Sequence, residues 1–219
     1  MKQKIVFIDE NSQANYSNNF LDLEANINFI VYKRATLNYF FDQTSFRGKN
    51  QALNFNLYIY DSSQVNFSFK ISDSCMTSLT INSFLIGQNS TLIIKGNYVL
   101  YGLRQVTIIT KQTHLGTDTK SEVIIRGALF GDSTANYHGT IYVDPKGLRT
   151  WASQENKNIL FSNSARATSI PCLEVLTDEV KCSHASAVGY FDKEYLFYMS
   201  SRGLDEQKAY ELLLKTFLV

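Results

Sequence analysis

The feature that most constrains this chain is an alternation of apolar and polar residues that recurs along most of its 219 residues. Runs with an apolar side chain at every second position are rich in β-branched and aromatic residues, as half-buried strands require. Short polar breaks separate the runs. We therefore predict an all-β protein. The runs lie at 53–59, 65–71, 79–81, 92–94, 106–108, 123–125 and 141–143.

Three all-β architectures fit this pattern: a sandwich, a closed barrel and a β-solenoid. The repetition favours the solenoid, as does the lack of the Asn-Gly and Asp-Gly turns that hairpins prefer. Only two prolines, Pro145 and Pro171, interrupt the chain. The sequence period is irregular, so the alternation alone leaves all three architectures open.

The C-terminal residues follow a different pattern. Residues 204–219 predict a helix, with Asp205 as its N-cap. A helix of this length is marginal alone, so it must dock on the β body or on a partner. We predict a β core over residues 1–200 and a helical segment over 201–219. The apolar stripe of that helix is Ala209, Leu212, Leu213 and Phe217.

Cys182 and His184 are the most informative polar pair. Residues two apart on a strand point to the same face, so one metal could meet both a sulfur and an imidazole. This ligand mix suits iron–sulfur chemistry, copper or zinc. Two ligands are too few for a closed site, so further ligands must come from elsewhere, for example from another chain.

Composition excludes several function classes. The net charge of +1 gives no broad attraction to nucleic acid or to anionic lipid. We see neither a signal peptide nor an apolar run that could span a bilayer. Three unevenly spaced cysteines (Cys75, Cys172 and Cys182) argue against a disulfide framework and predict a reduced, cytoplasmic location. The chain shows no phosphate loop, no nucleophile elbow and no Cys-x-x-Cys motif.

Several blocks in the C-terminal half resemble one known family. They begin with His114-x4-Thr119-x-Ser121 and an aromatic-x-Gly-x-x-x-Val strand over 137–143. Further blocks cover 154–160 and 171–175, and the longest runs from Asp178 through Val180-Lys-Cys-Ser-His184 to Gly203. In order and spacing they are similar to the SufB/SufD core of the SUF iron–sulfur cluster assembly system. The resemblance covers residues 110–217, and residues 1–109 are compatible β sequence.

Within that family, the segment around His184 looks closest to SufD. SufB-type chains carry a cysteine where this chain has Ala165 and a glutamate where it has Ala185. The thiolate and carboxylate expected of the scaffold subunit are therefore missing, whereas the SufD-type histidine is kept.

The resemblance implies a right-handed parallel β-helix followed by a short C-terminal α-helix. It implies a non-catalytic subunit that pairs with a SufB-type subunit through the C-terminal strands. It also implies docking of a SufC-type ATPase on the helical region, and a transient iron or Fe–S cluster at a subunit interface, with none held by this chain alone. Two copies pairing with each other would bring two His184 side chains together.

The chain also departs from the family pattern. Ala185-Ser186-Ala187 replaces the usual Gly-Ala-Thr after the histidine. Strands begin near Lys4, where relatives have a helical region, and the chain stops at Val219. We expect this shorter C-terminal segment to dock the ATPase less extensively.

Each candidate residue has a structural alternative. His184 is expected to offer its imidazole to iron or a growing cluster, or else to be satisfied by a backbone carbonyl. Cys182 is a second ligand or a small buried apolar group. Leu212, Leu213 and Phe217 form a partner-docking face or core packing. Structural roles explain His114, His138, Arg202 and the other two cysteines.

Two other functions compete with cluster assembly. A carbohydrate-active β-helix needs clustered carboxylates or basic residues in a groove and is usually exported. A self-associating structural solenoid needs no metal and forms homopolymers.

Overall fold

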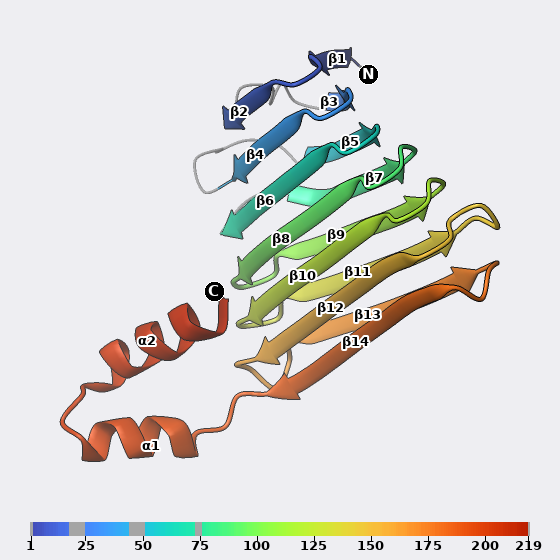
Figure 1. Ribbon diagram of the computed structural model, residues 1–219. Helices are drawn as coiled ribbons and strands as arrows, with labels where there is room; N and C mark the ends of the chain where they lie inside the picture. Colours follow the sequence, from blue (N-terminus) through green and yellow to red (C-terminus); the bar gives the residue numbers. More distant parts are fainter. Residues whose placement is uncertain (1, 18–24, 44–50, 73–75, 219) are drawn as a thin grey trace.

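The chain folds into a parallel β-helix with two short helices at its C-terminal end (Figure 1). The computed structural model describes residues 2–17, 25–43, 51–72 and 76–218. Two seven-stranded parallel sheets face each other, and the chain alternates between them. Sheet A holds β1 (Lys2–Ile8), β3 (Ala25–Val31), β5 (Gln51–Ile59), β7 (Met76–Leu85), β9 (Gln105–His114), β11 (Thr134–Val143) and β13 (Arg166–Val175). Sheet B holds β2 (Gln13–Ser17), β4 (Thr36–Asp42), β6 (Gln64–Ser72), β8 (Thr91–Leu100), β10 (Lys120–Leu129), β12 (Thr150–Leu160) and β14 (Val180–Tyr190).

The alternation in the sequence sets which side chains enter the space between the sheets. In β6, for example, Val65, Phe67, Phe69 and Ile71 are buried, whereas the residues between them are partly or fully exposed. Parallel pairing in register places each inward residue over an inward residue of the previous turn, as for Phe67 and Ile94. The predicted solenoid is thereby confirmed over its two alternatives, because neither a sandwich nor a barrel has this strand order.

The interior changes character along the helix axis. Its first turns are filled by aromatic and aliphatic groups such as Phe29, Phe55 and Phe67. Later turns keep apolar residues such as Val123 and Ile125 but add buried polar side chains, among them Gln112, His114, Ser121, Gln154, Asn156 and Asn158. Apolar burial therefore stabilises the whole solenoid, while the C-terminal part depends in addition on internal hydrogen bonds between buried polar groups.

One corner of the solenoid repeats the same backbone conformation turn after turn. Where the chain passes from sheet A to sheet B, one residue in each of the first six passages has a positive φ near 55°. Backbone hydrogen bonds between successive turns continue through this corner; for example, Asp118 N donates to Leu148 O at 2.9 Å. These residues are Asn11, Arg34, Ser62, Asn89, Asp118 and Arg149.

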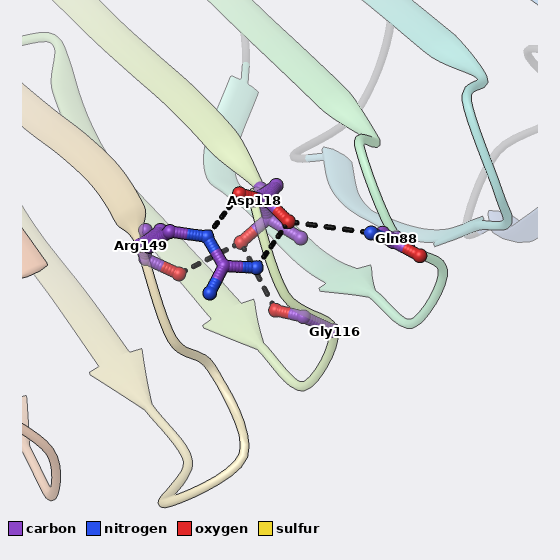
Figure 2. Close-up of polar contacts among 6 residues, drawn as sticks. Gln88, Gly116, Asp118 and Arg149 are labelled. Carbon is purple, nitrogen blue, oxygen red and sulfur yellow. Dashed lines mark hydrogen bonds and ion pairs between the residues drawn. The ribbon is translucent and has the colours of Figure 1, made fainter. Parts of the chain in front are cut away.

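Side chains reinforce this corner in the later turns. Figure 2 shows the Arg149 guanidinium facing the Asp118 carboxylate, with Gln88 on the other side. Arg149 Nε and Nη2 each donate to one carboxylate oxygen at 2.6 Å, and Gln88 Nε2 donates at 3.3 Å. The hydrogen bonds from Arg149 lower the pKa of the Asp118 carboxyl to about 2. The pair therefore stays ionised down to acidic pH and joins neighbouring turns.

Two helices follow the last strand, α1 (Glu194–Ser201) and α2 (Glu206–Leu218). The predicted C-terminal helix is confirmed as α2, and Lys208 N donates to Asp205 Oδ1 at 2.9 Å, as an N-cap requires. Helix α1 departs from the sequence prediction, which continued the β core to residue 200 and began the helical segment at residue 201. Arg202 instead caps the C-terminal end of α1. Neither helix is long and apolar enough to cross a bilayer, a finding that covers the described residues.

Helix α2 folds back beside sheet B (Figure 1). Tyr210 packs on the rings of Phe161 and Phe191, with centroids 5.9 and 5.4 Å away. Those two rings belong to a stack that runs along the second corner through Tyr101 and Phe130. Near the C-terminal end, Asn97 Nδ2 donates to Leu218 O at 3.3 Å. The helix is thus anchored to several turns of the β-helix.

Candidate functional site

The C-terminal end of the β-helix is open. Strands β13 and β14 are the last members of their sheets, and no described strand pairs with their outer edges. Both helices lie to one side of this end and leave the edges uncovered (Figure 1). Free strand edges present a row of backbone donors and acceptors that another strand can pair with.

Cys182 and His184 both lie on β14 at this open end. They are register partners of Ala152 and Gln154, which are inward and buried. Parallel strands in register keep the same residues on the same face, so both candidate ligands point to the inner side of the last turn. The predicted shared face is confirmed. With no further turn above it, the His184 side chain is exposed rather than sealed inside.

The Cys182 thiol is in a more apolar setting than His184. It is half-buried and packs with Ile141, Val143 and Ala152 at the end of the core. Burial raises the pKa of this thiol, although a hydrogen bond with the Ala152 backbone partly offsets the effect. The group is therefore a protonated thiol at neutral pH, and it would have to lose a proton to ligate a metal.

A connected set of buried polar side chains lies directly beneath this end. His114 is fully buried, with Nδ1 2.7 Å from Thr119 Oγ1 and Nε2 2.8 Å from Ser121 Oγ. Ser121 Oγ donates to Gln112 Oε1 at 2.5 Å, and Gln112 Nε2 donates to Gln154 Oε1 at 3.5 Å. Burial lowers the pKa of His114 to about 3, so the ring is neutral.

This network contains residues that the sequence analysis did not single out. The sequence predicts a structural role for His114 and places it in one motif with Ser121, but it relates neither Gln112 nor Gln154 to that motif, and none of these residues to His184. The available signal was the replacement of apolar residues by polar ones at inward positions of β9, β10 and β12. Reading that signal requires the register between strands, which the irregular period hides.

The remaining predicted residues lie away from the open end. Leu213 and Phe217 of α2 line a small apolar pocket of about 280 Å³ against the β-helix, together with Phe161 and Phe191. Leu212 points outward and is 46% exposed. The predicted stripe is therefore divided, and only its Ala209, Leu213 and Phe217 part packs inward. Cys172 is exposed on the outer face of β13, and Cys75 lies outside the described residues.

A groove of about 820 Å³ lies at the corner where the chain enters β14. Lys120, Trp151 and Lys181 form one row across adjacent strands there. Asp178 and Glu179 also line it, so its cations are largely balanced. The residues that line this groove do not include His184.

Metal-binding side chains are not clustered in the described part of the chain. No group of three or more His, Cys, Asp or Glu side chains is placed to hold a metal ion there. The open end thus presents one imidazole and one half-buried thiol, which are fewer ligands than a closed metal site requires.

Comparison with known proteins shows one consistent similarity. The family model described as "SUF system FeS cluster assembly, SufBD core domain" matches residues 1–217, well beyond the region where the sequence blocks were recognised. An iron–sulfur cluster assembly SufBD family protein from Mycobacterium leprae is 40% identical over 112 residues, which are 48% of this chain and 29% of the relative.

The iron–sulfur cluster assembly protein SufD of Escherichia coli is 28% identical over 157 residues, 72% of this chain and 37% of the relative. A SufBD family protein from the alga Antithamnion is 26% identical over 132 residues, 60% and 43% of the two chains. The chain thus spans less than half the length of these relatives.

Proposed function

Because the chain belongs to the SufBD family of the SUF iron–sulfur cluster assembly system, we propose that it acts as a SufD-type, non-catalytic subunit. In this role the open end of the β-helix pairs with a SufB-type subunit. His184 is offered across the shared interface to iron or to a growing cluster, which is the cargo of the complex. The observation that carries the proposal is the exposed His184 on an unpaired edge strand.

The unpaired edges support pairing with another β-helix. A strand edge of this length exposes backbone groups that gain hydrogen bonds when a second edge adds to it. The core is also incompletely covered at this end, since Val175, Val180 and Cys182 are only partly buried. A partner placed on this end would cover those groups and bury them in the interface.

The ligand chemistry supports a shared rather than a private site. Imidazole can replace thiolate as a ligand of cluster iron. The described chain offers too few clustered ligands for a closed site. By the family resemblance, the SufB-type partner supplies the thiolate and carboxylate that this chain lacks at Ala165 and Ala185.

Docking of a SufC-type ATPase is proposed on the outward side of the helices. Leu213 and Phe217 are engaged with the chain's own β-helix, whereas Leu212 and the aromatic residues Tyr195, Phe197 and Tyr198 are exposed. An exposed apolar patch of this kind is typical of a protein interface. Leu212 is therefore the one of the three predicted docking residues that is free to contact a partner.

The test is co-expression with SufB-type and SufC-type chains, followed by reconstitution of cluster assembly. We expect His184→Ala to leave the complex intact and to lower the assembly rate strongly. Ser183→Ala, on the outer face of the same strand, is the matched control and should assemble clusters normally. Normal assembly by His184→Ala would refute the role of the imidazole. Purification of homopolymers alone would favour the self-associating solenoid.

A further inference from the structure

The hydrogen bonds beneath the open end have one consistent direction. Ser121 has a single hydroxyl hydrogen and gives it to Gln112 Oε1. Its oxygen must then accept from His114, so the neutral ring carries its hydrogen on Nε2. Nδ1 is left as an acceptor for the Thr119 hydroxyl at 2.7 Å, a shorter contact than the 3.4 Å from that hydroxyl to Gly116 O.

The same direction continues at both ends of the chain of bonds. Since Thr119 gives its hydrogen to His114, the contact of 2.9 Å with Thr150 must be donated by the Thr150 hydroxyl. At the other end, Gln112 Nε2 donates to Gln154 Oε1 at 3.5 Å, and Gln154 Nε2 donates to Gly139 O at 3.1 Å. These two bonds fix the orientation of the Gln154 carboxamide, with Oε1 toward Gln112 and Nε2 toward Gly139.

The absence of a side chain at Gly139 leaves room for the Gln154 carboxamide. A Cβ added at Gly139 would come within 2.6 Å of Gln154 Oε1 and 2.5 Å of Tyr137 Oη. Real Cβ atoms do not approach other atoms so closely, so only glycine leaves room for the amide there. Gln154 is 2% exposed and lies in register with His184 on the adjacent strand, on the same inner side.

A carboxamide oxygen has two lone pairs, and the hydrogen bond from Gln112 Nε2 uses one of those on Gln154 Oε1. Metal-binding histidines commonly donate their other ring N–H to an oxygen that fixes the ring and its tautomer. From this geometry, and resting on the proposed function of His184, we infer that Gln154 is its positioning residue. Its Oε1 accepts the hydrogen of one imidazole nitrogen and turns the other nitrogen's lone pair toward the open end.

The test is NMR of the ¹⁵N-histidine-labelled chain at about pH 9, where imidazole is neutral. In the wild type we expect one His184 tautomer and an observable, exchange-protected ring N–H. Gln154→Met, which keeps the length but removes the amide, should give a tautomer mixture and lose that N–H signal. Gln154→Glu, which keeps carboxyl oxygens at the site, should retain a single tautomer.

Asn156→Leu is the matched control, because Asn156 is an equally buried amide on β12 but lies in register with Ser186. It should lower stability without changing the His184 signals. An unchanged His184 spectrum in Gln154→Met, or a tautomer mixture in the wild type, would overturn the inference.

The consequence for function is measured separately. In the reconstituted complex, Gln154→Met should lower the assembly rate about tenfold or more, as loss of a ligand's supporting hydrogen bond commonly does. Normal assembly by His184→Ala would refute the proposed function but leave the NMR result to decide the Gln154 contact. Loss of assembly in His184→Ala with unchanged His184 signals in Gln154→Met would refute the positioning role alone.

Discussion

Cys182 and His184 point to the same side of β14, but they have different surroundings: the thiol packs against Ala152 at the end of the core, and the imidazole is exposed. The difference follows from their register partners, since a small apolar residue lies beneath the first and a glutamine beneath the second. The two residues therefore have separate, measurable properties.

The Cys182 thiol should be poorly reactive at neutral pH. Burial raises its pKa above the ordinary cysteine value of 9.0. The thiolate fraction is therefore small near pH 7 and still increases with pH beyond 9. We expect the alkylation rate of a variant retaining only Cys182, made by Cys75→Ser and Cys172→Ser, to increase up to and beyond that pH. A rate that levels off below pH 9 would contradict the apolar setting.

Acid should destabilise the fold through His114. The unfolded chain takes up a proton near the ordinary value of 6.5, whereas the folded chain resists protonation down to about pH 3. The contribution of the neutral His114 ring to stability is therefore fully present above the unfolded-state pKa of 6.5, and it is lost as the pH falls from there toward 3. Between about pH 8 and 5 we expect a loss of roughly 2 kcal/mol in the free energy of unfolding.

Denaturant titrations of His114→Gln and His138→Gln test this assignment. The first variant should be less stable at neutral pH but should lose most of that pH dependence. The second replaces an exposed histidine of β11 and should keep the wild-type slope. Identical slopes in the wild type and in His114→Gln would show that another group is responsible.

Glycine at position 96 is required by the packing of the interior. A Cβ there would overlap the ring of Phe69, the residue beneath it in the previous turn. We expect Gly96→Ala to cost about 1–3 kcal/mol. The control is Gly189→Ala on β14, where no atom lies within 4 Å of an added Cβ. Thermal melts of the two variants should differ clearly, and equal melting temperatures would refute the packing argument.

Docking of α2 should depend on Tyr210. Its ring contacts both Phe161 and Phe191, whereas Phe197 of α1 is 78% exposed. In hydrogen exchange, Tyr210→Ala should speed exchange across 206–218 and leave the central strands unchanged. Phe197→Ala should have no such effect, and a wild-type exchange pattern in Tyr210→Ala would show that other contacts hold the helix.

The repeated alternation was sufficient to predict strands and an all-β class, because a half-buried strand has a simple period. It could not choose the solenoid without the family resemblance, since strand pairing is not local. The α2 helix was predictable from Asp205 and its apolar spacing. Helix α1 was not, because its exposed aromatic residues Tyr195, Phe197 and Tyr198 are also typical of strands.

The candidate site was predictable in part. The spacing of Cys182 and His184 was enough to place them on one face, and the resemblance pointed to His184. The hydrogen-bond network beneath them could not be predicted, because Gln112 and Gln154 are 42 residues apart in sequence and meet only in the folded interior. Leu212 was grouped with Leu213 because helical spacing identifies a face only approximately, and the docking angle of α2 decides which residue is covered.

The most direct test of the central claim is hydrogen–deuterium exchange of residues 180–190 with and without a SufB-type partner. If the open end is the interface, the β14 amides that do not bond to β12 should become strongly protected when the complex forms. The opposite edge, at 13–17, should be unchanged and serves as the control. A stable complex in which residues 180–190 exchange as fast as in the free chain would contradict this account.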